Sequence, residues 1–338
     1  MSDRMSTYRG DAESGFHTLV PDTVIDLAER ALGRRLTSLC RPLNSYINRV
    51  YELQDDDGVG VIAKFYRPGR WSYRALQDEH DFLFELDELE IPVVAPLRSE
   101  DGQSLHQHDG YYFVLFPKKL GRGLDEPSME QWEELGRLMA RVHLVGATRR
   151  PKDRMTMHPR YSTREHLDYI LTRDVVPRDM RNRYRDVVES MIELIAPMFD
   201  SVEMLRIHGD CHAANLVYRP GESFTLIDFD DMVTGPPIQD LWMLLPDYGV
   251  ASLVEIDLFL DGYTTFRSFD RRMLKLIEPL RAMRFIHFSA WCAMQAADGG
   301  FTRLAPDWGS TTYWKNEIND LEQQKGEIVS SQTAFWGM

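Results

Sequence analysis

In the first third of the chain, apolar residues recur in short alternating stretches, a pattern typical of β-strands. These stretches predict three strands, at 39–43, 50–53 and 59–66. The Asp-Asp-Asp-Gly turn at 55–58 joins the last two, so we expect them to form an antiparallel hairpin. A short helix is predicted before them, over 22–32, because its apolar residues lie on one face after a Pro-Asp-Thr start signal: Val24, Ile25, Leu27, Ala28 and Leu32.

After the hairpin, the apolar residues recur at the spacing of a helix. A helix is predicted from about residue 71 to residue 89, with an apolar face formed by Leu76, Leu83, Leu86 and Leu89. Two further strands are predicted, near 93–97 and at 111–116. After Pro117 the pattern is mainly helical, and a strand-rich island interrupts it. The predicted elements of this part are helices over 129–145, 164–172 and 179–199, the island over 205–229, and helices from 238 to the C-terminus.

This change of pattern predicts an α+β protein with two lobes. We expect residues 1–16 to be a flexible leader, because they are polar and rich in charge. Residues 17–116 are expected to form a small N-lobe, made of an antiparallel sheet and one helix, and this lobe is expected to grip the phosphates of a nucleotide. Residues 117–338 are expected to form a large, mainly helical C-lobe with the catalytic loop, the metal site and the substrate helices. A cleft between two lobes is a common place for a small-molecule site.

Composition excludes several classes of protein. The chain of 338 residues carries a formal net charge of −14, which argues against broad binding of nucleic acid or anionic membranes. Its three cysteines, Cys40, Cys211 and Cys292, are widely spaced, so we expect no disulfide framework and no structural zinc site. There is no apolar run long enough to cross a membrane and no secretory signal, so we expect a cytoplasmic protein.

The strongest chemical signal is the segment HGDCHAAN, residues 208–215, followed by IDFD, residues 227–230. Phosphoryl transfer requires a carboxylate that receives the proton of the attacking hydroxyl and oxygen ligands that hold Mg²⁺ against the phosphates. Asp210 and Asn215 have the spacing of the catalytic loop of kinases, and Asp228 ends an apolar strand. We therefore predict that Asp210 is the base and that Asn215 and Asp228 are the magnesium ligands.

Two upstream segments are candidates for binding ATP. Lys64 ends the strand sequence VIAK, which is typical of the lysine that holds the α- and β-phosphates. Its expected ion-pair partner is Glu79 on the following helix, with Asp78 and Glu85 as competitors. A Gly-rich phosphate loop is missing before Lys64, and the turn at 42–49 takes its place, where Ser45 can offer a hydroxyl to the phosphates.

Two further polar residues have structural interpretations. Asp240 lies in the segment PPIQDLW, and we expect it to cap a helix or to hold the backbone of the catalytic loop. Arg284 lies one helical turn after Arg281, and such a pair is more often found on the surface or in ion pairs than in a ligand site.

With these motifs the chain resembles the protein-kinase-like superfamily, in its branch of aminoglycoside phosphotransferases and choline kinases. It is similar in particular to the bacterial stress response kinase A family. The segments that carry this similarity reach from residue 43 to residue 284: LNSYINRVYEL, KFYRPGRW, RIHGDCHAANLVYR, GPPIQDLWMLL and IEPLRAMR.

The resemblance implies a bilobal protein-kinase-like fold and a monomeric, cytoplasmic Ser/Thr protein kinase. Such a kinase depends on ATP and Mg²⁺, phosphorylates itself and counters envelope or oxidative stress. By position, the resemblance assigns Asp210 as the proton acceptor, Asn215 and Asp228 as magnesium ligands, and Ser45 as a residue that contacts ATP.

The residues themselves leave the acceptor open. Only residues 229–239 separate Asp228 from Asp240, and no APE motif follows, so the long segment on which protein kinases bind polypeptides is missing. Position 209 is Gly, so the arginine that would read an activating phosphate is missing too. These features favour a kinase of a small hydroxyl compound, such as an aminoglycoside, choline, homoserine or a sugar. A third alternative is an inactive nucleotide-binding module.

Overall fold

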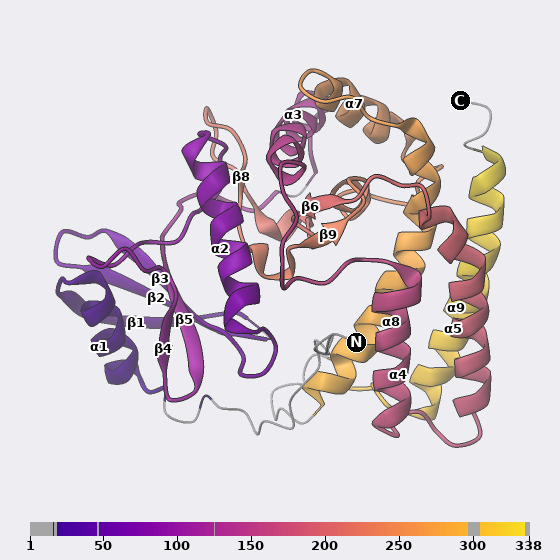
Figure 1. The fold of residues 1–338 in the computed structure, drawn as a ribbon, viewed down its shortest axis with the longest axis horizontal. Helices are drawn as coiled ribbons and strands as arrows, with labels where there is room; N and C mark the ends of the chain where they lie inside the picture. The colour runs from indigo at the N-terminus through magenta and orange to yellow at the C-terminus, as the bar shows by residue number, and fades with distance from the viewer. Residues whose placement is uncertain (1–15, 17–18, 46, 125, 297–304, 335–338) are drawn as a thin grey trace. The chain divides into compact units, whose positions relative to one another are not determined.

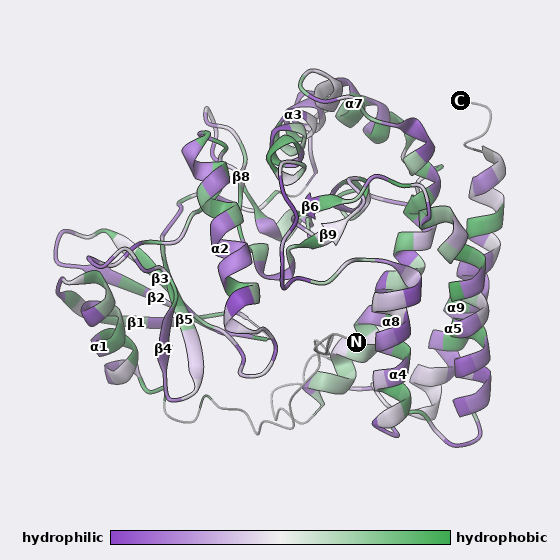
Figure 2. Cartoon of the chain, in the orientation of Figure 1, coloured by the Kyte–Doolittle hydropathy of each residue, from purple (hydrophilic) through white to green (hydrophobic). Residues whose placement is uncertain are grey.

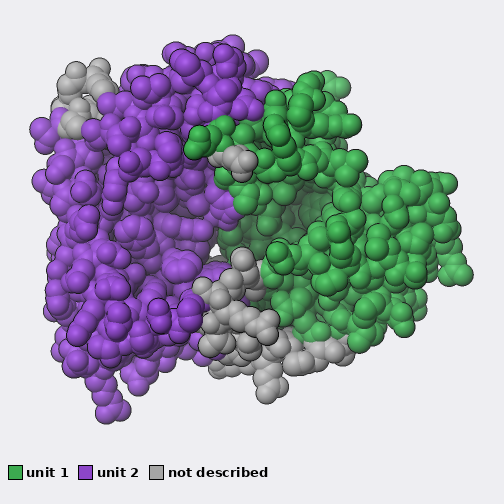
Figure 3. Space-filling view, turned by 180° about the vertical axis from the view of Figure 1, so that it is seen from behind, with its two compact units in different colours: residues 1–126, 151–154, 213–232 green, residues 127–150, 155–212, 233–338 purple. Residues whose placement is uncertain are grey.

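The computed structural model describes residues 16, 19–45, 47–124, 126–296 and 305–334. The chain divides into two compact units, which Figure 3 colours separately. Unit 1 consists of residues 1–126, 151–154 and 213–232, and unit 2 of residues 127–150, 155–212 and 233–338. The predicted leader lies outside the described residues except for Phe16, which packs against the core of unit 1.

The described residues of unit 1 form a five-stranded antiparallel sheet in the order β1-β2-β3-β5-β4 (Figure 1). Its strands are β1 (Leu36–Leu43), β2 (Arg49–Asp55), β3 (Gly60–Phe65), β4 (His106–His108) and β5 (Tyr111–Pro117). The predicted hairpin is confirmed as β2 and β3, and the strand at 111–116 is confirmed as β5. The predicted strand near 93–97 is wrong, because Val93 makes only an isolated bridge to Leu226.

Two helices of unit 1 cover the sheet, and Figure 1 shows α1 (Pro21–Leu32) and α2 (Tyr73–Glu88) on either side of it. Successive residues of a strand point to opposite faces. In β5, Phe113 and Leu115 therefore join the apolar cluster of α1, whereas Val114 packs with Leu76 of α2. Figure 2 shows hydrophobic and hydrophilic residues on both helices, as expected for elements with one buried face.

The same alternation places the predicted phosphate-binding lysine. In β3, Val61, Ala63 and Phe65 belong to the cluster on the α1 side. Lys64 lies between Ala63 and Phe65, so its side chain leaves the sheet on the α2 side. The position of this lysine thus follows from the apolar pattern of the strand around it.

The strand-rich island contributes a small hairpin to unit 1. It consists of β7 (Leu216–Val217) and β8 (Thr225–Leu226), which pair in antiparallel fashion. The N–H of Leu226 donates to the carbonyl of Pro92, just after α2, with an N···O distance of 2.9 Å. This contact brings the chain around residue 228 toward α2, although the two segments lie far apart in the sequence.

Unit 2 is mainly helical. Its elements are α3 (Met129–Gly146), the π-helical turn Pro159–Thr163, α4 (Arg164–Thr172), α5 (Arg181–Ile195), the 3₁₀ turn Ala196–Phe199, α6 (Gln239–Trp242), α7 (Leu253–Thr264), the 3₁₀ turn Arg271–Leu276, α8 (Ile277–Gln295) and α9 (Thr311–Ala334), with β6 (Leu205–Ile207) paired to β9 (Val233–Gly235). The helices predicted over 129–145 and 164–172 are confirmed, and the one over 179–199 ends as a 3₁₀ turn. The predicted α+β class is therefore confirmed. None of the described helices is long and apolar enough to span a membrane.

Helices α3 and α7 approach each other closely because each contributes a glycine at the contact. A Cβ at Gly136 would lie 1.9 Å from the carbonyl oxygen of Phe259, and a Cβ at Gly262 would lie 1.9 Å from that of Glu133. These neighbours are backbone atoms, which cannot rotate away as a side chain can. The crossing of α3 and α7 therefore requires glycine at both positions.

We predict that Gly136→Ala lowers the free energy of unfolding of unit 2 by about 1–3 kcal/mol, because the helices must separate to admit the methyl group. The matched control is Gly326→Ala in the exposed part of α9, where a Cβ would meet no atom within 4 Å. That change should raise the free energy of unfolding by about 0.5–1 kcal/mol, through helix propensity. Denaturant unfolding measures both, and equal effects of the two substitutions would contradict the proposed close crossing.

Candidate active site

Lys64 is a buried cation paired with carboxylates. Only 5% of the residue is exposed, and its Nζ lies 2.7 Å from Oδ1 of Asp228 and 3.6 Å from Oδ1 of Asp230. Burial alone would lower the pKa of Lys64, but the carboxylates of Asp228 and Asp230 outweigh burial and raise the pKa above its ordinary value. Lys64 is therefore charged at neutral pH, as its predicted role in binding phosphate requires.

Asp228 lies two residues after the end of β8 in a left-handed backbone conformation, with φ of 61°. Such a conformation is unfavourable for a residue other than glycine by roughly 1 kcal/mol, and it is found often at functional sites. The side chain of Asp228 is half-exposed, although it pairs with Lys64. The N–H of the preceding residue, Ile227, donates to the carbonyl of Asn215 over 3.0 Å. The structure thus brings the segments of Lys64, Asn215 and Asp228 together within unit 1.

The oxygen atoms of Asn215 and Asp228 fit the chemistry of Mg²⁺. Magnesium prefers hard oxygen ligands and is often bound by one or two carboxylates together with substrate phosphates. Across the part of the chain that the structure describes, no group of three or more His, Cys, Asp or Glu side chains could hold a metal ion by itself. Asn215 and Asp228 would supply two of the oxygen ligands of a magnesium ion, and waters and nucleotide phosphates would supply the others.

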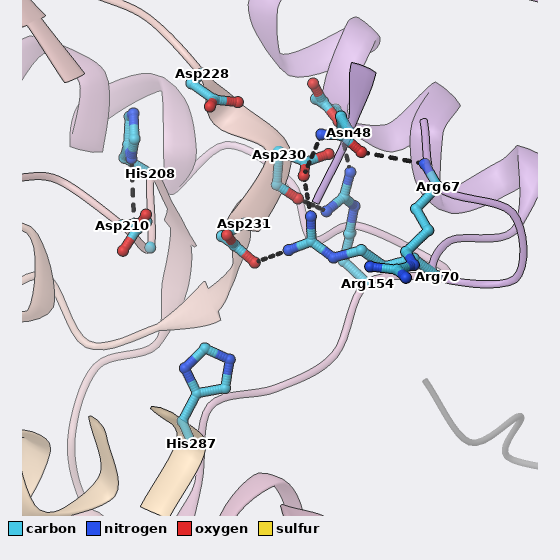
Figure 4. A network of polar contacts seen from close by, with 12 residues as sticks. Asn48, Arg67, Arg70, Arg154, His208, Asp210, Asp228, Asp230, Asp231 and His287 are labelled. Atoms are coloured by element: carbon cyan, nitrogen blue, oxygen red, sulfur yellow. Dashed lines mark hydrogen bonds and ion pairs between the residues drawn. The ribbon is translucent and has the colours of Figure 1, made fainter. Parts of the chain in front are cut away.

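Asp230 is the centre of a polar network that the sequence did not predict (Figure 4). One of its oxygens, Oδ2, accepts hydrogen bonds from Asn48, over 3.1 Å, and from Arg70. Arg70 also donates to Asp231 over 2.6 Å. Burial alone would raise the pKa of Asp230, but Arg70 and Lys64 outweigh it and hold this pKa below its ordinary value. Asp230 is therefore a buried, fully ionised carboxylate.

The expected ion pair between Lys64 and Glu79 is not formed among the described residues. Glu79 is buried on α2, and its Oε2 lies 2.8 Å from Nη2 of Arg154. Its other oxygen accepts a hydrogen bond from the hydroxyl of Tyr66 over 3.2 Å. Glu79 pairs with Arg154 instead of Lys64, and Arg154 comes from a segment 75 residues later in the chain. Local sequence patterns cannot predict a contact between residues so far apart. The competitor Asp78 instead accepts the backbone N–H groups of Lys152 and Asp153.

In unit 2, Asp240 holds the backbone of the loop that contains Asp210. Its two carboxylate oxygens accept the N–H groups of His208 and Gly209, each over 2.8 Å. His143 contacts the same carboxylate over 3.1 Å, and Asp240 is fully buried. The expectation that Asp240 holds this loop is confirmed. The loop also needs glycine at position 209, where φ is 85°.

Asp210 makes two charged contacts in unit 2. Its Oδ1 lies 3.1 Å from Nη2 of Arg284 on α8, and its Oδ2 lies 3.4 Å from Nε2 of His212. Burial alone would raise the pKa of Asp210, but its contacts with His212 and Arg284 outweigh burial and hold the pKa below its ordinary value. The sequence left either a surface position or an ion pair open for Arg284, and the structure shows an ion pair with Asp210.

The remaining predicted residue, Ser45, lies in the turn between β1 and β2 and is half-buried. Its neighbour Tyr46 is outside the described residues. The role of Ser45 in binding ATP stays a prediction, as do the catalytic and metal-binding roles of the other site residues. Lys64, Asn215 and Asp228 belong to unit 1, whereas Asp210 belongs to unit 2.

Sequence comparison supports a relationship over most of the chain. The sequence model of the phosphotransferase enzyme family matches residues 39–276. The chain is 36% identical to stress response kinase A of Escherichia coli (strain K12), over 92% of this chain and 94% of that protein. It is 35% identical to serine/threonine protein kinase RdoA of Salmonella typhimurium, over 91% of this chain and 93% of that protein. The resemblance inferred from the motifs is therefore confirmed.

Solved structures confirm the predicted protein-kinase-like fold. Amicoumacin kinase hAmiN, in complex with AMP-PNP, Ca²⁺ and Ami, has a TM-score of 0.70 at 20% identity, over 88% of this chain and 93% of that one. A microcompartment-associated aminopropanol kinase has a TM-score of 0.64 at 18% identity, over 91% of this chain and 98% of that one. At such identities the likeness extends to the fold alone.

We predict that Asp240→Asn lowers the free energy of unfolding by roughly 2–4 kcal/mol, because an amide offers one oxygen to two buried N–H donors and adds a donor of its own. Asp261→Asn on the exposed side of α7 is the matched control and should change stability by less than about 0.5 kcal/mol. Thermal and denaturant unfolding provide the measurement. Similar small effects for both variants would mean that Asp240 does not hold the loop.

Proposed function

The chain belongs to the phosphotransferase enzyme family, and from this premise we propose that it transfers the γ-phosphoryl group of ATP, with Mg²⁺, to a serine or threonine hydroxyl of a protein. The observation that carries the proposal is the buried, charged Lys64 beside Asp228, in the same unit as Asn215. A kinase needs a cation for the phosphates and oxygen ligands for the metal, and these residues supply both.

In this proposal Lys64 binds the α- and β-phosphates. Its ammonium group is already charged and desolvated, so a nucleotide phosphate can replace the carboxylate of Asp228 as its partner without a change of protonation. Asp228 and Asn215 hold Mg²⁺, which neutralises the charge of the transferring group when it is bound. The turn that contains Ser45 offers a hydroxyl and backbone N–H groups to the phosphates.

Asp210 orients the acceptor hydroxyl and receives its proton. Since its pKa lies below the ordinary range, Asp210 is ionised throughout the neutral pH range and is a weak base. A weak base suits phosphoryl transfer, because the transition state is loose and the hydroxyl loses its proton late. Asp240 supports this role by holding the two residues before Asp210 in place.

A protein acceptor is proposed from the curated relatives. They are named stress response kinase A and, in one case, serine/threonine protein kinase, at 35–36% identity over nearly the whole chain. By extension, we propose that this protein phosphorylates itself as well as other proteins, acts in the cytoplasm as a monomer and takes part in a response to stress.

A kinase of a small hydroxyl compound is the second candidate, and one observation favours it. Only residues 229–239 lie between Asp228 and Asp240, and in the structure they form a 3₁₀ turn, β9 and the approach to α6. That is little chain for binding a polypeptide. An inactive module is disfavoured, because the chain retains the four residues that the reaction needs: Lys64, Asp210, Asn215 and Asp228.

We predict that the purified protein, incubated with Mg²⁺ and ATP labelled in the γ-phosphate, incorporates label into its own serine or threonine residues. Phosphoamino acid analysis identifies the labelled residue type, and Asp210→Asn, which removes the proposed base, is the control that should remain unlabelled. Label that appears only on an added amino alcohol, sugar or aminoglycoside would favour the second candidate. A protein that consumes no ATP with any of these acceptors would contradict the assignment as a kinase.

We predict different defects for Asp210→Ala and Asp228→Ala, because the first residue acts on the acceptor and the second on the metal. Asp210→Ala should keep its affinity for Mg·ATP and lose turnover by roughly 10²–10⁴-fold, the usual contribution of a positioned base. Asp228→Ala should weaken Mg·ATP binding as well as turnover, because it lacks a ligand of the metal.

Calorimetry of Mg·ATP binding together with a turnover assay separates the two variants. Thermal unfolding serves as the control that both remain folded. Near-native turnover of Asp210→Ala would remove Asp210 as the base. A folded Asp210→Ala protein that fails to bind Mg·ATP would instead identify Asp210 as a metal ligand.

A further inference from the structure

Cations and carboxylates of unit 1 are paired differently from what the motifs predict. Lys64 contacts the two aspartates that follow β8, Asp228 and Asp230. Glu79, the expected partner of Lys64, pairs with Arg154. No ion pair joins Glu79 to Lys64 among the described residues, although the charge of Glu79 contributes to the raised pKa of the lysine. The question is which carboxylate keeps Lys64 in place when a nucleotide binds.

Arg154 is fixed in its position by contacts in three directions. Its side chain is fully buried and lies over the ring of Trp71, with 4.0 Å between the guanidinium carbon and the ring centroid. Nε donates to the carbonyl of Ala75 over 2.8 Å, and Nη1 donates to the carbonyl of Asp230. Nη2 donates to Glu79 over 2.8 Å. A guanidinium so fully satisfied keeps Glu79 as its partner, because breaking the pair would leave two buried charges without compensation.

Asp230 is fixed in the same way but faces Lys64. Asn48 and Arg70 hold one oxygen of its carboxylate, and the other oxygen points to Lys64 (Figure 4 shows the contacts of Asp230 with Asn48 and Arg70). The side chain of Asp230 is 6% exposed, whereas that of Asp228 is 50% exposed. Asp228 is therefore accessible to a metal ion, whereas Asp230 stays bound to Asn48 and Arg70. If Asp228 moves away from Lys64, Asp230 still contacts the lysine.

We propose that Asp230 is the positioning residue that holds Lys64 toward the nucleotide phosphates, and that Arg154 keeps Glu79 out of this role. The inference rests on the proposed function, since it requires that Lys64 binds the nucleotide. In this protein α2 is anchored through Arg154, so the contact that changes on nucleotide binding is the one between Lys64 and Asp228.

The test is a double-mutant cycle of Asp230→Asn and Lys64→Met in the full-length protein. Calorimetry measures the affinity of each variant for a non-hydrolysable ATP analogue, once with EDTA and once with Mg²⁺. In EDTA, Asp230→Asn should weaken binding roughly tenfold or more, because a lysine without its anchor loses its fixed position. In a Lys64→Met background, Asp230→Asn should cause no further weakening, because its effect acts through the lysine. Glu79→Gln should change the affinity by less than about threefold, since Glu79 holds Arg154 instead.

Asp231→Asn is the matched control, because Asp231 is the next residue and pairs with the same Arg70. It should bind the analogue within about threefold of the wild-type protein. Thermal unfolding shows which variants are folded, and if Asp230→Asn is not folded, Glu79→Gln decides the question by itself. Loss of binding in Glu79→Gln as large as in Lys64→Met would overturn the proposal.

Two other results would overturn it as well. Asp230→Asn also removes a negative charge that would repel the phosphates. If this substitution strengthens binding of the ATP analogue both with Lys64 and in the Lys64→Met background, Asp230 acts on the nucleotide by charge repulsion and does not position the lysine. Weakened binding only in the presence of Mg²⁺ would make Asp230 a metal ligand. A wild-type protein that binds no nucleotide under either condition would refute the proposed function itself, whereas the other results refute only the role of Asp230.

Discussion

Lys64 carries its ammonium group into the interior of unit 1, where a cation is stable only beside carboxylates. The alternation of β3 leaves no other place for it, because its neighbours Ala63 and Phe65 fill the core on the α1 side. Asp228 and Asp230 supply the compensating charge. The buried carboxylate of Asp230 in turn needs donors of its own, which Asn48 and Arg70 provide, while Arg154 donates to the backbone carbonyl of Asp230. One lysine thus requires a network that joins the turn before β2, the segment after β3 and the chain after β8, and Arg154 extends this network to α2.

The loop of Asp210 in unit 2 also depends on a buried charge that needs compensation, but here the charge is negative. Here the buried charge is a carboxylate, Asp240, and its compensation consists of two backbone N–H groups and His143. The loop is thereby fixed by a residue that lies 30 or more positions later in the chain. Buried polar groups are costly unless satisfied, so such a carboxylate positions a loop more strictly than apolar packing does.

The sequence predicted what local patterns determine and missed what distant contacts determine. The alternation in β2, β3 and β5 predicted these strands and placed Lys64 on β3, and the spacing of Asp210, Asn215 and Asp228 indicated the chemistry. The strand near 93–97 was wrong because its apolar residues lack a continuous partner strand, which is decided by the tertiary fold. The ion pairs Glu79–Arg154, Asp230–Arg70 and Asp210–Arg284 join residues more than 70 positions apart, and a single sequence carries no signal for them.

The pairing also determines how the charged residues can act. Neighbouring carboxylates raise the pKa of Lys64, and Arg284 and His212 lower that of Asp210. Both groups therefore stay charged across the neutral pH range, and neither can be switched by a small change of pH. What can change is the ion-pair partner: the half-exposed Asp228 is accessible to a metal ion of the kind that the proposed function requires, whereas Asp230 is buried. Under the proposed function, the transition from a resting to a nucleotide-bound state is an exchange of ion pairs at constant protonation, and its free energy is set by how well the new partners replace the old ones.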